Sequence, residues 1–437
     1  KQQGRGRGTH GVPAEIVLLG ALAAAWATTY AMILPLGGGP DEPAHLQLIR
    51  FVAETGRLYT FGVDDARAGY EVQQPPLYYV IGAAVAKALA PLGPRRLQYA
   101  LRLISVAIGT AVTFLAWATA RRALSRDRRQ GPCDADDAPN DDPAPFVAAA
   151  FAGLLPHVLL LASIVNNDAA AMLFWSLALL AIVRAMDVSA WSRWALAGAV
   201  VGLAILSKLS GLVLIPVLLA AAGLAARRLR SPSEFAKAAG ASLAACALVS
   251  GWWFARCYAL SGRLITSNVT PFSILTQPMY EPQRRKFIWM AIKGPYLSFW
   301  AQMGWLPATV APAVYVILSV LALAAGLGLL LLVRRSRGPA APRLDRLAVM
   351  VTAALCVAVV LYAYVFLRNF YMHEGGRYMM PAIVAFAVLV AAGLREWAKE
   401  SAAAAVKWAM VALLMALNAL CLYNLLTYLI PTYGPKA

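Results

Sequence analysis

Long apolar runs constrain this chain more than any other feature of its sequence. A helix needs about 20 apolar residues to cross the hydrocarbon core of a bilayer. The chain has 437 residues, of which 60% are hydrophobic and 14% charged, whereas soluble domains carry about 25% charged residues. We therefore expect an all-α polytopic membrane protein. About eleven spans are expected, at residues 15–36, 98–120, 145–165, 169–186, 194–207, 209–226, 237–256, 306–333, 346–367, 378–394 and 403–427.

Short basic clusters set the expected orientation of these spans. Lys and Arg are enriched in cytoplasmic loops, and a cytoplasmic N-terminus places every cluster on that side when the spans number eleven. The same bias, with attraction to anionic lipid, explains the net charge of +18 without nucleic acid. We expect a multi-pass protein of the bacterial cytoplasmic (inner) membrane whose site faces the periplasm or outside. The clusters precede the first span and lie at Arg121, Arg122, Arg227, Arg228, Arg334, Arg335 and Arg395.

Cysteines and common catalytic motifs exclude several classes of protein. The five cysteines are scattered and lie mostly inside apolar runs, so neither a disulfide framework nor a cysteine metal motif is expected. The chain has no Walker loop and no GxGxxG after a predicted strand, and it has no HExxH or GxSxG pattern. Nucleotide-driven transport and the common hydrolase classes therefore lose support.

The first outside loop, residues 37–97, is expected to contain two helices beside the membrane. Apolar residues recur at helical spacing from Glu42 to Thr55, so an interfacial helix should occupy that stretch. Gly56 should end it. The apolar stretch from Leu77 to Leu92 follows two prolines, and we expect a juxtamembrane or re-entrant helix there.

Two other segments complete what we expect to be a single transmembrane domain, residues 1–437. Residues 121–144 gather acidic residues and prolines, which predicts a flexible cytoplasmic loop. The fourth outside loop, residues 257–305, mixes basic and aromatic side chains. That mixture is typical of a belt at the level of the lipid headgroups, or of a lipid-phosphate site.

An acidic pair, Asp41 and Glu42, follows the first span within the sequence GGGPDEPAH. Asp41 can cap the helix that follows, or its carboxylate can accept a proton from a nucleophile while Glu42 binds that nucleophile or a cation. Both roles are compatible, because a cap fixes the position of the side chain. His45 shares a helix face with Asp41 and is either a polar interfacial residue or part of the same site.

Two further ionisable residues lie at the expected membrane boundary, where such groups often line functional cavities. Asp168 opens the fourth span, either as its N-cap or as a second carboxylate facing Asp41 across a cavity. Lys208 follows the short fifth span, which should turn back at Ser207. Its side chain either snorkels to the interface or binds a phosphate.

Arg377 and a basic triplet are the remaining candidates for anion binding. Arg377 follows Gly375 and Gly376, which allow the backbone to approach a ligand, and a guanidinium suits bidentate phosphate binding. The triplet is either attracted to lipid headgroups or contributes to a phosphate site. It consists of Arg284, Arg285 and Lys286.

The order of these motifs resembles the GT-C glycosyltransferases, polytopic enzymes that use a lipid-phosphate sugar. The nearest clan is that of protein O-mannosyltransferases and lipid A aminoarabinose transferases. The resemblance covers the chain from the first span to about residue 395. Its motifs are the Asp-Glu pair, PPLYY about 30 residues later, an Asn-Asp heading a later span, GLAILSKLSGLVLIPVLL, GWWFARCY, and Gly-Arg-Tyr-x-x-Pro before a late span.

The resemblance implies a reaction and a set of roles. A polyprenyl-phosphate monosaccharide would enter from the bilayer, and its sugar would pass, with inversion, to a glycan, lipid or protein acceptor. Asp41 would be the base and Asp168 a second catalytic acidic residue, while Glu42 and His45 would bind the acceptor or a cation. The donor phosphate would lie on Arg377, Lys208, Gln74, Arg284, Arg285 and Lys286. Further donor or substrate contacts would be Tyr78, Tyr378, His373 and Glu374.

This chain departs from the aminoarabinose transferases at one motif. Those enzymes carry Glu-Lys where this chain has Gln73 and Gln74 before its two prolines. Neutral amides neither balance a phosphate charge nor bind a cation strongly, although Gln74 can still hydrogen-bond to a phosphate or sugar. No cofactor is required by the sequence. A divalent cation is left open, on Asp41, Glu42 and Asp168.

Three other functions remain open on the sequence alone. A transporter or flippase of a lipid-linked glycan could use the same basic and aromatic belt, but it should carry polar residues through several spans. A polymer ligase that uses a diphosphate-linked glycan differs from the proposed enzyme in donor size. A non-catalytic assembly subunit would not need Asp41, Glu42, Asp168 and Arg377 on one face.

Overall fold

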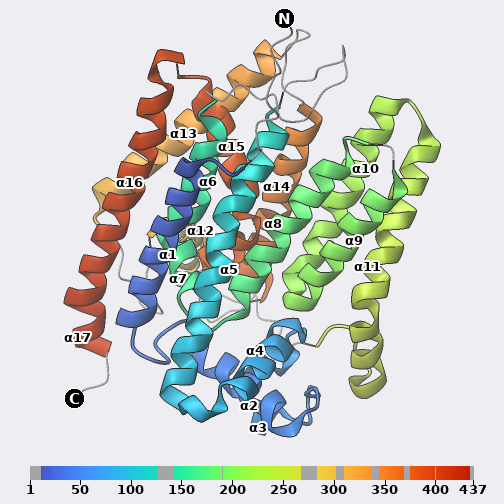
Figure 1. Ribbon diagram of the computed structural model, residues 1–437, viewed down its shortest axis with the longest axis vertical. Coiled ribbons are helices and arrows are strands. Elements are labelled where there is room, and N and C mark those ends of the chain that lie inside the picture. The colour runs from blue at the N-terminus through green and yellow to red at the C-terminus, as the bar shows by residue number, and fades with distance from the viewer. Residues whose placement is uncertain are drawn as a thin grey trace, which may run out of the picture.

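The structure, a computed structural model, describes residues 11–125, 142–188, 190–266, 283–301, 310–336, 344–368, 375–398 and 400–433. Within these ranges the chain is helical and contains no strand. The long helices stand side by side in a bundle, with shorter helices below it in Figure 1. The expected all-α polytopic class is confirmed.

Nine helical segments of the described residues are long and apolar enough to cross a membrane. Small-residue positions such as Gly328 bring some of them close together: a Cβ there would lie 1.9 Å from the Gly393 carbonyl oxygen of the neighbouring helix. The nine are α1 (Ala14–Ile33), α5 (Pro94–Ala123), α8 (Asn167–Ala185), η3 (Leu209–Val213) with α10 (Leu214–Leu229), α11 (Pro232–Ser261), α13 (Pro312–Arg335), α14 (Leu344–Arg368), η5 (Gly375–Ala382) with α15 (Ile383–Arg395), and α16 (Ala403–Asn424).

Two expected spans are less regular than the others. α6 (Ala144–Leu154) and α7 (Pro156–Ala162) meet at a 55° bend, because Pro156 cannot donate a backbone hydrogen bond and keeps Leu155 extended. α9 (Trp191–Ser207) has 17 residues and ends at Ser207, where a turn was expected. Every expected span thus contains a helix, and the number of full crossings stays a prediction.

The core is centred on α6, all of whose residues are buried. A helix that is apolar on every side is typical of the middle of a bundle. α1, α5, α15 and α16 contact α6 around its circumference. This packing fixes the ends of the surrounding helices relative to one another, which matters for the charged groups at both ends.

Ion pairs join the basic clusters at one end of the bundle. Arg122 pairs with Asp187, Arg395 with Asp142 at 2.9 Å, and Arg335 with Glu396 at 3.3 Å. The clusters at Arg122, Arg335 and Arg395 therefore share one end of the molecule. Which side of the membrane that end faces stays a prediction.

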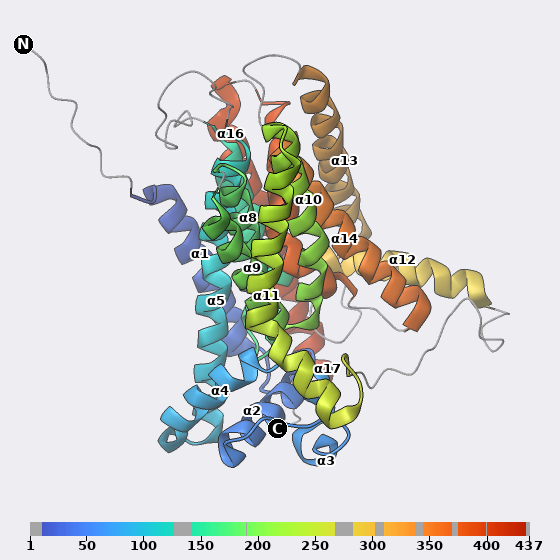
Figure 2. The ribbon, with the colours of Figure 1, turned by 90° about the vertical axis from the view of Figure 1, so that its right-hand side faces the viewer.

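The opposite end carries a layer of short helices, seen at the bottom of Figures 1 and 2. The helix expected from Glu42 to Thr55 is present with those bounds as α2, and Gly56 ends it with a left-handed φ of 67°. The helix expected over Leu77–Leu92 is present as α4 and η2, with a break at Leu89. The elements of this layer are α2 (Glu42–Thr55), α3 (Asp65–Ala68), η1 (Tyr70–Gln73), α4 (Leu77–Ala88) and η2 (Ala90–Leu92).

The remaining elements lie at the edges of the bundle. α12 (Arg284–Ala301) lies across the long helices, and its first residues point away from them in Figure 2. η6 (Glu400–Ala402) precedes α16, and η7 (Leu425–Leu429) and α17 (Ile430–Tyr433) follow it. The division into loops at residues 37–97, 121–144 and 257–305 stays a prediction.

Candidate active site

Asp41 lies at the turn that leads into α2 and faces two donors from other elements. Its Oδ2 atom is 2.6 Å from Arg377 Nη1, and its Oδ1 accepts a hydrogen bond of 2.7 Å from the Tyr70 hydroxyl. The residue is at the N-cap position, yet its side chain makes no capping hydrogen bond. Its φ of 57° lies in the left-handed region, which non-glycine residues rarely adopt and which often marks functional positions.

Charge and burial act in opposite directions on Asp41. Burial alone would raise the pKa of its carboxyl, but the Arg377 guanidinium and the Tyr70 hydrogen bond outweigh burial and lower that pKa below its ordinary value. Burial lowers the pKa of the neighbouring His45, although Glu71 and Asp41 oppose that change. Asp41 is therefore an anion and His45 a neutral imidazole near pH 7.

A second acidic–basic pair, Asp168 and Lys208, lies beside the first. The N-cap of α8 is Asn166, whose side chain accepts a hydrogen bond of 3.0 Å from the Ala169 amide. Asp168 is consequently not needed as a cap, and its Oδ1 binds Lys208 Nζ. Both residues are buried. Lys208 has extended backbone at the end of α9, which directs the chain away from the helix axis.

Tyr378 links the two pairs. The Lys208 ammonium lies 5.4 Å from the centre of the Tyr378 ring, and the Arg377 guanidinium lies 5.0 Å from it. Arg377 Nη2 also donates a 3.0 Å hydrogen bond to the Tyr378 hydroxyl. The two cations thus share one aromatic side chain, as the attraction between cations and aromatic faces favours.

Gln74 and Tyr78 come from the chain that enters α4. The Gln74 Oε1 atom accepts a hydrogen bond of 3.2 Å from Asn167 Nδ2, next to Asp168. The buried Tyr78 ring meets the His45 ring edge to face, with 6.4 Å between ring centres. The structure therefore brings both predicted residues to the same group as Asp41 and Asp168.

The backbone of Arg377 is held by α12. The Gly376 amide donates a 2.8 Å hydrogen bond to Ser298 Oγ. A Cβ on Gly376 would lie 2.2 Å from the Phe299 backbone nitrogen, so this position requires glycine. The predicted residues His373 and Glu374 lie outside the described residues.

Arg284, Arg285 and Lys286 are not brought to this group. They begin α12 at the end that points away from the bundle in Figure 2, and the Arg285 and Lys286 side chains are exposed. Such a position agrees with the alternative in which the triplet attracts lipid headgroups.

Glu42 occupies a closed network rather than a free position. Its carboxylate forms a bidentate pair with Arg102, at 2.7 and 2.6 Å, and accepts hydrogen bonds from the Gly37 and Val165 amides. Both side chains are fully buried. Arg102 also donates to the carbonyls of three residues at the end of α1, which are Ala31, Leu34 and Pro35. The geometry gives Glu42 a structural role and leaves it no free oxygen for an acceptor.

The chain also offers a group that could hold a metal ion. Ligand atoms of Asp41, His45 and Glu71 lie within 4.8 Å of one another. This set differs from the expected Asp41, Glu42 and Asp168, because Glu42 is bound to Arg102 and Asp168 to Lys208.

Three residues of this site were not assigned a role from the sequence, namely Arg102, Tyr70 and Glu71. In the sequence Arg102 looks like the basic residues that stand at the start of other spans. It is, however, the ninth residue of α5, and a charged residue that far inside a span usually has a buried partner. Tyr70 and Glu71 lie in a polar loop, where nothing in the sequence shows that η1 packs against α2.

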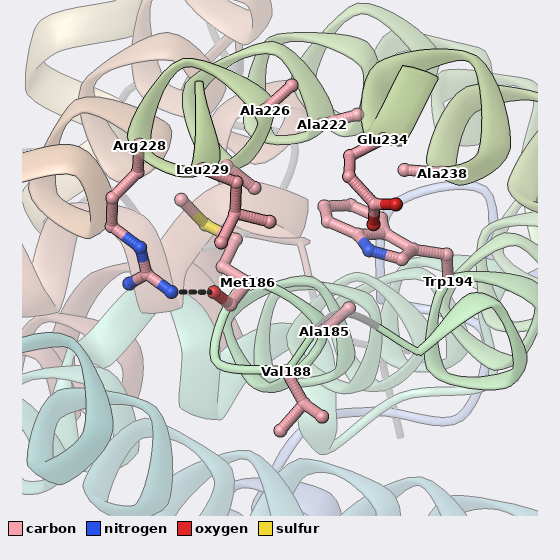
Figure 3. A pocket seen from close by; sticks show the side chains of 11 residues that line it. Ala185, Met186, Val188, Trp194, Ala222, Ala226, Arg228, Leu229, Glu234 and Ala238 are labelled. Carbon is pink, nitrogen blue, oxygen red and sulfur yellow. Dashed lines mark hydrogen bonds between the residues drawn. The ribbon is translucent and has the colours of Figure 1, made fainter. Parts of the chain in front are cut away.

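A separate small pocket, partly open to solvent, lies at the other end of the bundle. Figure 3 shows Arg228 donating a hydrogen bond to the Met186 carbonyl there, with Glu234 and Trp194 opposite. It contains none of the predicted site residues.

Comparisons with known proteins agree with this architecture. Residues 141–253 match the family described as dolichyl-phosphate-mannose-protein mannosyltransferase. ArnT from Cupriavidus metallidurans bound to undecaprenyl phosphate is similar over 96% of this chain and 72% of its own, with 17% identity and a TM-score of 0.53. No curated protein sequence matches the chain.

An archaeal oligosaccharyltransferase has a related structure. AglB from Archaeoglobus fulgidus, in complex with an inhibitory peptide and a dolichol-phosphate, is similar over 94% of this chain and 56% of its own, with 12% identity and a TM-score of 0.51. The fold is the GT-C fold of membrane glycosyltransferases. The resemblance expected from the motifs is confirmed.

The GT-C fold places the chain among multi-pass membrane proteins. At these levels of identity the likeness describes the path of the backbone. The roles of individual side chains therefore rest on their contacts in this chain. This chain spans little more than half the length of AglB.

Proposed function

We propose that this protein is a membrane glycosyltransferase that moves one monosaccharide from a polyprenyl phosphate to an acceptor. The observation that carries the proposal is the direct contact of a candidate base, Asp41, with a candidate phosphate-binding cation, Arg377. The matched family is named for mannosyl transfer from dolichyl phosphate. The ArnT structure contains undecaprenyl phosphate.

The donor phosphate would bind between Arg377 and Lys208. Both cations face Tyr378, so one phosphate at that ring reaches both. Gln74, which hydrogen-bonds with Asn167 beside Asp168, can donate its amide to a phosphate or sugar oxygen. Fixed cations at this point stabilise the negative charge that develops as the phosphate leaves.

The transfer itself is a displacement at the anomeric carbon. The acceptor oxygen forms a bond to this carbon as the bond to the phosphate oxygen breaks, and the polyprenyl phosphate leaves with the electron pair. The proton of the acceptor passes to Asp41. A single displacement of this kind inverts the configuration of the sugar.

Asp41 becomes a stronger base when the donor binds. Arg377 holds the pKa of the Asp41 carboxyl below its ordinary value in the structure. A phosphate that draws Arg377 away removes that charge from Asp41 and raises its pKa, because the two anions compete for one guanidinium. The Asp41 carboxylate therefore becomes a stronger base only when the donor is bound. Asp168 holds Lys208 in position through their ion pair.

The site would open toward the periplasmic or outer face of a bacterial inner membrane. It lies at the end of the bundle opposite the basic clusters, and the distribution of positive residues predicts that those clusters are cytoplasmic. Lipid donor and acceptor would then meet at the outer leaflet, where a glycan, lipid or protein acceptor is accessible.

The experiment uses the purified protein in nanodiscs with a polyprenyl-phosphate hexose and an envelope extract as the source of acceptor. Mass spectrometry should detect free polyprenyl phosphate and a product heavier by one sugar. A donor that crosses the bilayer intact in proteoliposomes, with no cleavage, would instead identify a flippase. Turnover of a diphosphate-linked glycan and not of the monophosphate would identify the polymer ligase.

A further inference from the structure

The Tyr70 hydroxyl binds the oxygen of Asp41 that Arg377 does not hold. Arg377 Nη1 lies 2.6 Å from Asp41 Oδ2, whereas the Tyr70 hydroxyl donates a hydrogen bond of 2.7 Å to Oδ1. Both oxygens of the proposed base are therefore occupied in the structure. An acceptor hydroxyl that gives its proton to Asp41 must make the kind of contact that Tyr70 makes here, an O–H group donated to a carboxylate oxygen.

The two oxygens of Asp41 face different substrates. In a single displacement the acceptor approaches the anomeric carbon from the side opposite the leaving phosphate. The proposed phosphate-binding cation, Arg377, contacts Oδ2, so that oxygen faces the donor phosphate. The oxygen that serves the acceptor is then Oδ1, and Tyr70 holds it.

Tyr70 extends from the solvent-exposed surface of the layer of short helices to a buried carboxylate. It is 49% exposed, whereas the Asp41 that it contacts is 9% exposed. Tyrosine suits such a position, because its ring is apolar and its tip is polar. The side chain therefore stands where an acceptor that enters from the aqueous side would approach Asp41.

The backbone on both sides of Tyr70 is held by hydrogen bonds. Before η1, Gln47 Nε2 donates a hydrogen bond of 3.1 Å to the Arg67 carbonyl. After η1, the Tyr59 hydroxyl donates one of 2.7 Å to the Gln74 carbonyl. The Tyr70 hydroxyl can therefore leave its carboxylate partner by rotation of the side chain, with the backbone in place.

From these contacts we infer that Tyr70 determines whether the acceptor or water receives the sugar. Its hydroxyl occupies the acceptor's position on Asp41 until an acceptor displaces it. An acceptor can displace it because binding contacts elsewhere on the acceptor offset the lost hydrogen bond, whereas water has no such contacts. A donor that binds without an acceptor is thereby protected from hydrolysis. This role rests on the proposed transferase activity.

Without the Tyr70 hydroxyl, water takes the place of the acceptor. The water oxygen forms a bond to the anomeric carbon as the bond from this carbon to the phosphate oxygen breaks. The polyprenyl phosphate leaves with the electron pair, and a proton of the water passes to Asp41. The products are free sugar and polyprenyl phosphate, so each such event consumes a donor without glycosylating an acceptor.

The test compares hydrolysis with transfer by the full chain in nanodiscs that contain a polyprenyl-phosphate hexose. Chromatography measures free sugar without acceptor, and glycosylated product with the envelope extract. Tyr70→Phe keeps the ring and should raise the release of free sugar by roughly 10–100-fold, the factor that corresponds to one hydrogen bond to a charged group. Its affinity for polyprenyl phosphate should match that of wild type, because Arg377 and Lys208 are unchanged. Tyr258→Phe is the matched control, because Tyr258 is an exposed tyrosine near the end of α11 that contacts the same layer.

The double variant Asp41→Asn with Tyr70→Phe separates this role from a loosened site. Hydrolysis that uses Asp41 as base should fall in the double variant to the level of Asp41→Asn alone, whereas water that leaks through a loosened site would still hydrolyse the donor. The inference is overturned if Tyr70→Phe releases no more free sugar than a wild type that transfers, or if the extra release persists in the double variant. A wild type that transfers no sugar contradicts the proposed function itself.

Discussion

Arg377 Nη1 lies 2.6 Å from Asp41 Oδ2, which joins the predicted phosphate-binding residue to the predicted base across more than 300 positions of sequence. Each residue therefore controls the charge that its partner presents to a substrate. Removing one should change the behaviour of the other in a measurable direction, and the first two predictions use that relationship.

Asp41→Asn should lower the rate of sugar transfer by roughly 10²–10⁴-fold, the usual contribution of a general base. Donor binding should stay the same or tighten, because Arg377 no longer pairs with an anion. Single-turnover kinetics and binding of polyprenyl phosphate measure the two effects. Asp65→Asn is the control, since Asp65 lies in the same layer and accepts a hydrogen bond that an Asn oxygen can also accept. Wild-type turnover in Asp41→Asn would remove Asp41 from the mechanism.

Arg377→Ala should weaken donor binding by about 10–100-fold, because a hydrogen bond to a charged group contributes about 1.5–3 kcal/mol. Arg377→Lys should recover part of the loss, since a point charge remains without the bidentate geometry. Titration with polyprenyl phosphate gives the affinities. Arg263→Ala removes an exposed arginine at the same end of the molecule and should bind as wild type does. An unchanged donor affinity in Arg377→Ala would contradict the phosphate assignment.

Glu42→Gln should destabilise the protein by about 3–5 kcal/mol, because it leaves the buried Arg102 charge unpaired. The double variant Glu42→Gln with Arg102→Met should recover much of that stability, since it removes both charges. Melting temperatures in one detergent compare the three proteins. A Glu42→Gln protein that melts like wild type but has lost transfer would instead return Glu42 to the chemistry.

His45 should make the protein less stable as the pH falls below about 6.5. Burial lowers the pKa of His45 from its ordinary value of 6.5, so the unfolded chain binds this proton more readily than the folded one. Stability is then fully present above pH 6.5 and decreases as the pH falls toward the folded pKa. Glu71, Asp41, Asp168 and Lys208 are the charged groups near the ring.

The measurement is the melting temperature of wild type and His45→Gln between pH 5 and 8, without metal. The difference between the two profiles isolates His45 from the other histidines. The difference in melting temperature between the two proteins should be constant above pH 6.5 and should become smaller at lower pH. Parallel profiles over the whole range would show that His45 has the same pKa in the folded and unfolded chains.

Local sequence patterns predict the helices of this protein and the end of the bundle at which the site lies. They do not predict which side chains from different helices contact each other. The helix from Glu42 to Thr55 could be predicted with its bounds, because apolar spacing and Gly56 are local signals. Asp41 and Asp168 could be placed at one end because the spans are long and apolar. The pairing of Glu42 with Arg102 could not be foreseen, since it depends on how α5 packs against the end of α1.

Glu71 shows the same limit within the candidate site. Its loop has no apolar period, so neither its burial nor its approach to His45 is encoded in a short pattern. Gln73 and Gln74, which follow Glu71, are the residues that differ from the motif of the aminoarabinose transferases. The side chain that approaches Asp41 is the Glu71 carboxylate, two positions before Gln73.

The left-handed backbone of Asp41 restricts which side chains this position can accept. Asp and Asn adopt that conformation more readily than other side chains do, and for most residues it costs roughly 1–2 kcal/mol. Asp41→Glu, which keeps the acid, should therefore disturb the turn more than Asp41→Asn, which removes it. The turn accepts Asp or Asn at this position, and proton transfer requires a carboxylate. Asp is the amino acid that meets both requirements, so a substitution at this position disturbs the turn, the proton transfer or both.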